Sequence, residues 1–205
     1  MSQSSGRREL YIILGTVAAL VALSTTLFVL SSRGELNLAS LLGTKNLGEL
    51  IAPPLPLSSV VEDPQWQDHS SNDYSDRLWT FLVIAEGGAC GDACAQALYL
   101  TRQVRTALGR ETYRVRRMLL LTAPPGSALT ALIEAEHPDL VTAQLAPEQL
   151  RSLFSAQPNL DPYLAGQYFV VDPEGWLMLR YVPGEDGKHL LSDINFLLKN
   201  SPEKR

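Results

Sequence analysis

The stretch that decides the fold is residues 78–98, LWTFLVIAEGGACGDACAQAL. It begins with an unbroken apolar run at residues 78–85, which is typical of a strand buried on both faces of a sheet. Two glycines follow, and then Cys90 and Cys94 stand four residues apart where a helix is predicted to begin. They are the only cysteines in the chain. A strand, a tight turn and a helix with a cysteine pair therefore form the predicted centre of the protein.

Downstream of this stretch, strands and helices are predicted to alternate. Apolar residues at helical spacing predict helices over residues 93–108, 127–136, 147–155 and 187–199. Apolar runs bounded by turn residues predict strands over residues 113–122, 140–145, 168–171 and 176–181. The last two strands flank the turn Asp-Pro-Glu-Gly, which predicts a hairpin. This order predicts an α/β domain over residues 78–200, with a mixed sheet flanked by helices.

Upstream, residues 10–30 contain no charged side chain. A run of roughly 20 apolar residues is long enough to cross a membrane as one helix. Arg7 and Arg8 precede the run and Arg33 follows it, so the slight charge bias predicts residues 1–9 in the cytoplasm and the domain outside. A cleaved signal peptide is the alternative, but the run exceeds the usual ~7–15 apolar residues and no small-x-small cleavage site stands out. We therefore expect a single uncleaved transmembrane anchor.

Residues 31–77 are predicted to be a linker. Residues 36–50 mix leucines with small and polar residues and suit either a short amphipathic helix at the membrane surface or a partly ordered connector. Residues 51–57, IAPPLPL, contain three prolines, which favour an extended polyproline-like path. We expect this segment to pack its leucines on the domain without joining the sheet. Residues 62–77 are polar and predict a loop.

Composition excludes several classes of function. The net charge of -5, from 22 acidic and 17 basic residues, gives no reason to expect a nucleic-acid partner. Two cysteines are too few for a disulfide framework, and an all-thiolate zinc site needs about four ligands. The three arginines Arg114, Arg116 and Arg117 suggest edge-strand or solvent-facing charges.

The cysteine pair is the candidate chemical site. Helical positions i and i+4 share a face, with Cα atoms ~6 Å apart, near the upper limit for a disulfide. We expect Asp92 to cap the helix and Cys94 to lie in its first turn. Free N–H groups and the helix dipole favour a thiolate there, whereas the negative charge of Asp92 disfavours it. Two chemistries fit this pair. One is thiol–disulfide exchange, in which the more exposed Cys90 attacks and Cys94 resolves, and the other is Cu(I) binding. A stabilising disulfide would close only a short loop.

A strand, a C-x-x-x-C at the head of a helix and a late FVVDPEG hairpin before a terminal helix resemble the Sco family. The resemblance rests on residues 81–85, Cys90, Cys94 and residues 169–175, and it extends over residues 50–200. It implies a membrane-anchored thioredoxin-like protein of the bacterial inner membrane and periplasm that helps to deliver copper to cytochrome c oxidase. Residues 43–57 are also similar to a segment in small proteins associated with bacterial oxidase assembly.

Two departures from the Sco pattern bear on copper. Ala95 stands where the family has proline, and residues 161–167, DPYLAGQ, have no histidine where the resemblance implies the third copper ligand. His137 and His189 are expected to be ordinary surface histidines, which leaves His69 in the linker as the one candidate.

Two hypotheses follow. The first is a thiol–disulfide or copper-handling protein that serves cytochrome oxidase assembly through Cys90 and Cys94, with an oxidase subunit or another assembly factor as partner. The second is a non-catalytic assembly scaffold on a degenerate Sco-like fold.

Overall fold

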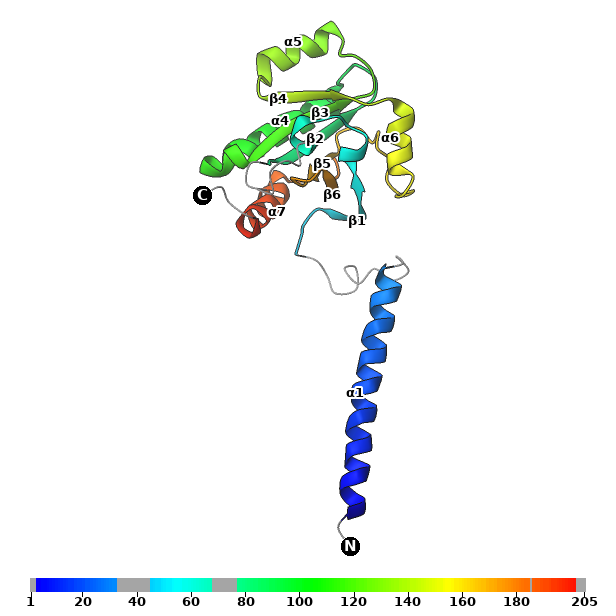
Figure 1. The fold of residues 1–205 in the computed structure, drawn as a ribbon. Helices are drawn as coiled ribbons and strands as arrows, with labels where there is room; N and C mark the ends of the chain where they lie inside the picture. Colours follow the sequence, from blue (N-terminus) through cyan, green and yellow to red (C-terminus); the bar gives the residue numbers. More distant parts are fainter. Residues whose placement is uncertain (1–2, 33–44, 68–76, 185, 202–205) are drawn as a thin grey trace. The chain divides into compact units, whose positions relative to one another are not determined.

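The structure is a computed structural model that describes residues 3–32, 45–67, 77–184 and 186–201. The chain forms two compact units, Met1–Thr44 and Lys45–Arg205. The second unit contains all the strands of the described residues (Figure 1). This unit begins at Lys45, whereas the sequence predicted that the domain would begin at residue 78.

The first unit is the helix α1 (Gln3–Ser32). Within it, Glu9–Val29 is long and apolar enough to cross a membrane, and none of this span is buried. Its hydroxyl groups are satisfied by the helix itself, because Thr16, Thr25 and Thr26 donate to backbone carbonyls three or four residues earlier at 2.7–2.8 Å. This helix has the length and composition of a membrane anchor, properties that a signal sequence near an N-terminus shares.

The second unit is built on one sheet of six strands in the order β1-β6-β5-β2-β3-β4. The strands are β1 (Glu49–Pro56), β2 (Trp79–Ala85), β3 (Val115–Leu121), β4 (Leu140–Gln144), β5 (Tyr168–Val171) and β6 (Trp176–Tyr181). β2, β3 and β4 are parallel, whereas β5 is antiparallel to both β2 and β6, and β1 is antiparallel to β6. The predicted mixed α/β sheet of a thioredoxin-like fold is therefore confirmed.

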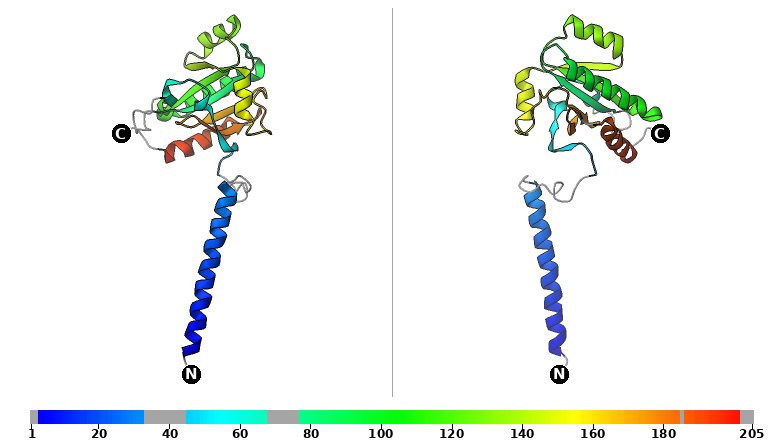
Figure 2. Two further views of the ribbon diagram at one scale, coloured as in Figure 1. Left: turned by 45° about the vertical axis from the view of Figure 1, so that its right-hand side comes forward. Right: turned by 180° about the vertical axis from the view of Figure 1, so that it is seen from behind.

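Helices cover both faces of the sheet (Figure 2). The helices of eight or more residues are α4 (Asp92–Ala107), α5 (Ser127–Glu136), α6 (Pro147–Phe154) and α7 (Gly187–Asn200); α3 (Pro64–Gln67) and the 3-10 segments η1 (Leu57–Ser59) and η3 (Gly109–Arg114) are short. Alternate residues of β2 point to opposite faces: Phe81 and Val83 pack with α4 and α7, and Leu82 and Ile84 pack with α6. This two-sided burial explains why the strand is apolar throughout.

The proline-containing segment is the main correction to the predicted architecture. Residues 51–57 were expected to pack without joining the sheet, yet most of them belong to β1, which pairs with β6 through Glu49, Leu50, Leu55 and Pro56. The register shifts between Leu50 and Leu55, so the prolines between them lie in an irregular stretch. Prolines are tolerated here because β1 is an edge strand that needs no ladder donor on its outer side. The apolar side chains do pack on the domain, as predicted.

The expected exposure of the arginines around β3 is also wrong. β3 lies between β2 and β4, so it is an inner strand. Arg117 is 1% exposed, Arg114 is buried at the end of η3, and Arg116 pairs with the buried Asp63 at 3.0 Å. A run of charged residues next to an apolar stretch suggested solvent exposure. The long arginine side chains instead reach hydrogen-bond partners inside the domain.

Candidate functional site

The cysteine pair lies where β2 passes into α4. Cys90 is in the loop before the helix and Cys94 is the third residue of α4. Their Cα atoms are 5.2 Å apart and their sulfur atoms form a disulfide. Cys94 is only 8% exposed and belongs to the core cluster beneath α4, whereas Cys90 is half-buried at its margin. A partner thiol approaching from solvent therefore meets the sulfur of Cys90 first.

Backbone contacts fix the loop that carries Cys90. The amide of Gly87 donates to the hydroxyl of Thr122 at 2.6 Å, and the carbonyl of Gly88 accepts from the amide of Gly126 at 2.8 Å. A Cβ atom at Gly88 would lie 2.0 Å from the carbonyl oxygen of Pro124. Glycine is thus required at residue 88 by close approach of the next loop, a constraint that the glycine pair in the sequence signalled only as a turn.

The start of α4 differs from the prediction in one detail. Gly91, not Asp92, is the N-cap residue, and no side chain caps the helix. Asp92 is the first helical residue and is exposed. The amide of Ala95 donates to the carbonyl of Gly91 at 2.9 Å, a bond that proline could not make. Alanine at residue 95, where the Sco pattern has proline, therefore allows the amide to make the first hydrogen bond of the helix.

A second loop, residues 161–167, approaches the same turn of α4. Gly166 has φ of +81°, and a Cβ atom there would lie 3.2 Å from both the Cβ and the carbonyl oxygen of Ala93. Gln167 is 1% exposed and accepts a hydrogen bond from Arg180 at 3.0 Å. The loop in which the Sco resemblance implies a third copper ligand is thus brought against the cysteine-bearing helix, and it contains no histidine.

Among the residues that the structure describes, no histidine is grouped with the two cysteines. His137 was expected at the surface but is 2% exposed, and its Nδ1 lies 3.4 Å from a terminal nitrogen of Arg117. Burial lowers the pKa of His137, and the positive charge of Arg117 lowers it further. His189 is half-buried in the first turn of α7, and His69 lies outside the described residues. Within the described ranges, no three His, Cys, Asp or Glu side chains are placed to hold a metal ion.

Reduced Cys90 and Cys94 would supply two soft sulfur ligands, which fits Cu(I) as a cargo but not a site for both copper oxidation states.

Comparisons with known proteins agree with this architecture. A family model described as the transmembrane-like, thioredoxin-like C-terminal domain matches residues 79–201. Copper-bound Sco1 from yeast superimposes with a TM-score of 0.50 at 14% identity, covering 78% of this chain and 97% of that chain. Apo Sco1 from Thermus thermophilus gives 0.48 at 21%, with 76% and 99% covered. No curated protein sequence matches the chain. The predicted resemblance to the Sco family is confirmed at the level of the fold.

Proposed function

The chain belongs to the family of the transmembrane-like, thioredoxin-like C-terminal domain, and from this premise we propose that it is a membrane-anchored thiol–disulfide oxidoreductase acting through Cys90 and Cys94. The observation that carries the proposal is the disulfide at the start of α4, with one sulfur half-exposed and the other buried. A disulfide that closes so short a loop removes little entropy from the unfolded chain, so stability alone is a weak reason for it.

The exchange reaction follows from these positions. A partner thiolate attacks Sγ of Cys90, a new S–S bond forms, and the Cys90–Cys94 bond breaks with Cys94 leaving as a thiolate. Backbone N–H groups of the first turn of α4 stabilise that leaving thiolate. A second partner thiol then displaces Cys90, so the partner becomes a disulfide and the protein gains two electrons and two protons. The reverse sequence reduces a partner disulfide.

Cysteine variants test this order of attack. Cys94→Ser leaves the exposed Cys90 thiol without its resolving partner, so we expect it to accumulate a mixed disulfide with an oxidised model peptide. Cys90→Ser leaves only the buried Cys94 and should accumulate at least about tenfold less. Mass spectrometry after acid quenching measures both species. Equal trapping by the two variants, or none by either, would contradict the proposal.

Copper handling is a second candidate, because the two sulfur atoms are held close enough to share one Cu(I) once reduced. An anaerobic titration of the reduced protein against a competing Cu(I) chelator tests it. One-to-one binding that is lost in either serine variant supports copper as cargo. Rapid disulfide exchange without competitive copper binding would leave only the oxidoreductase function.

We further propose that the domain works in the periplasm, attached to the bacterial inner membrane through α1, on a cytochrome oxidase subunit or another assembly factor. Cys94→Ser in spheroplasts should react at Cys90 with a membrane-impermeant maleimide; labelling only after lysis would refute the orientation. Either serine variant should lose oxidase copper loading. Normal loading in both would favour the non-catalytic scaffold instead.

A further inference from the structure

The disulfide lies at one edge of the sheet, which we call the disulfide edge. Ala85 pairs with Leu121 at the ends of the parallel strands β2 and β3, and Val83 of β2 pairs with Tyr168, the first residue of β5. The loops after β2 and β3 and residues 161–167 before β5 therefore all emerge at this edge. The contact of Gly166 with Ala93 closes the third loop onto α4.

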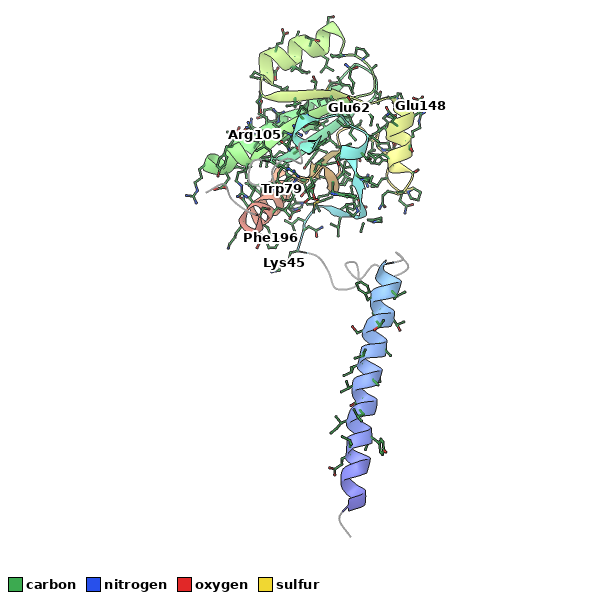
Figure 3. All side chains as sticks on the ribbon, in the orientation of Figure 1. Lys45, Glu62, Trp79, Arg105, Glu148 and Phe196 are labelled. Carbon is green, nitrogen blue, oxygen red and sulfur yellow. A yellow bond between two sulfur atoms is a disulfide. The ribbon has the colours of Figure 1, made fainter. Side chains whose placement is uncertain are left out.

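Acidic side chains gather at the same edge of the sheet as the disulfide. Glu86 and Asp92 flank Cys90 in the sequence, and both are exposed. Glu148 in the first turn of α6 (labelled in Figure 3) is exposed, and so is Asp161 in the adjoining loop. No ion pair is found for any of these four among the described residues, whose ion pairs lie elsewhere.

The half-buried side chain of Tyr163 is influenced by three of these carboxylates. Its pKa is raised, first by burial; Arg151 opposes the rise, and the carboxylates of Glu86, Glu148 and Asp161 add to it. Three carboxylates and one guanidinium from three different elements thus act on a single side chain of the loop. With Asp92, four acidic side chains and the basic side chain of Arg151 lie at the disulfide edge outside the ion pairs found among the described residues. Arg180 at the end of β6 and Lys188 at the start of α7 are each paired with an acidic side chain.

The opposite ends of the strands carry charges of both signs: Glu174 is exposed in the turn between β5 and β6, and a hollow nearer α7 is lined mainly by basic side chains. This hollow of about 340 Å³ between η3 and α7 is lined by Arg110, Arg114 and Lys199, with Glu111 as the acidic member. The exposed acidic side chains at the disulfide edge create a negative field there. Such a field orients an approaching charged molecule and raises its rate of encounter by about 10- to 1000-fold at low ionic strength.

We propose that the thiol partner of the Cys90–Cys94 disulfide is a protein segment whose cysteines are flanked by lysine or arginine residues. This inference rests on the proposed oxidoreductase function and names its partner class. A basic segment would be drawn to the disulfide edge and turned so that its thiol faces Cys90. An acidic segment would be repelled from that edge.

Two dithiol peptides of one sequence, differing only in three lysines or three glutamates around the cysteines, test the proposal. The full chain in nonionic detergent is oxidised, mixed with each peptide, quenched with a maleimide and analysed by mass spectrometry. At about 10 mM salt we expect the basic peptide to reduce the disulfide at least about tenfold faster. At about 0.5 M salt the two rates should converge, because exposed charges are then screened over a few ångströms.

Variants assign the preference to named residues. The pair Glu86→Gln and Asp92→Asn should reduce the low-salt preference several-fold. The matched pair Glu134→Gln and Glu136→Gln removes two exposed charges from the C-terminal end of α5 and should leave it unchanged. The rate with dithiothreitol, measured for every variant, corrects for changes in the intrinsic reactivity of the disulfide, so that the ratio of the two peptide rates isolates the charge preference.

Equal rates for the two peptides at low salt would overturn the inference, as would a preference that survives the Glu86 and Asp92 substitutions. Failure of both peptides to reduce the disulfide, while dithiothreitol does so, would instead overturn the proposed function on which the inference rests.

Discussion

Removing the buried guanidinium of Arg117 should destabilise the domain more than any other change to a charged side chain of β3. Arg117 has no exposed side-chain surface. It donates to the carbonyl of Leu98 at 2.6 Å and to Asp139 at 3.1 Å, and its Nε lies 3.4 Å from the hydroxyl of Thr101. Leu98 and Thr101 belong to α4, so this one side chain joins the cysteine-bearing helix to the inner strand.

The size of the effect depends on what replaces the arginine. Arg117→Ala removes one partner of a buried charged network and leaves a cavity, which typically costs about 3–5 kcal/mol. Arg117→Met keeps most of the apolar stem. Asp139 would still pair with Arg105 at 3.0 Å, so no carboxylate is left without a partner. We therefore expect Arg117→Met to cost about 2 kcal/mol less than Arg117→Ala.

Urea unfolding of the oxidised chain in nonionic detergent, followed by tryptophan fluorescence, measures both losses. Arg105→Met is the matched control, since its side chain is 26% exposed (Figure 3). Loss of a partly exposed ion pair and of one hydrogen bond to the carbonyl of Val115 should cost no more than about 2 kcal/mol. A loss below about 1 kcal/mol for Arg117→Ala, or equal losses for alanine and methionine, would refute the reasoning.

Three further predictions concern other parts of the domain. Gly88→Ala should lower the free energy of unfolding in urea by about 1–3 kcal/mol, because the added methyl group would collide with Pro124. The control Gly126→Ala, whose Cβ atom would make only ordinary contacts, should lower it by well under 1 kcal/mol. Equal losses for the two variants would contradict the prediction. His137 has a pKa lowered below 6.5 in the folded state, so the unfolded chain binds the proton first and the unfolding free energy should fall as the pH drops below about 6.5. His137→Gln should lose that part of the pH dependence, and an unchanged pH profile would refute it. Asp193, 4% exposed, accepts from the amides of Leu47 and Gly48 and from Tyr181; Asp193→Asn should cost about 1.5–3 kcal/mol and speed limited proteolysis near residue 47, whereas unchanged cleavage would argue against this anchor.

Much of the domain was readable from local patterns. The continuous apolar run of β2, the helical spacing in α4 and the Pro-Glu-Gly turn before β6 each fix a local conformation through burial or backbone geometry, and each was found where predicted. The predictions failed where the pairing or the burial of a residue depends on a segment that is distant in the chain. β1 depends on an edge position beside β6, which is more than a hundred residues away in the chain. The burial of Arg117 and His137 depends on Asp139 and α4 closing over them.

The sequence by itself determined the apolar helix at the N-terminus, the order of strands and helices, and the presence of two cysteines one helical turn apart. These features follow from composition and from spacing along the chain. The sequence also predicted that Cys90 would be more exposed than Cys94, but only the tertiary structure decided how far Cys94 is buried, at 8% exposure within the core beneath α4. The tertiary structure alone brought the charges of Glu86, Glu148 and Asp161 to act on one side chain, that of Tyr163. The physical reason is that burial and electrostatic fields depend on which segments pack together. Strand pairing joins segments that lie far apart in the chain, and their local sequences do not show that they will pair.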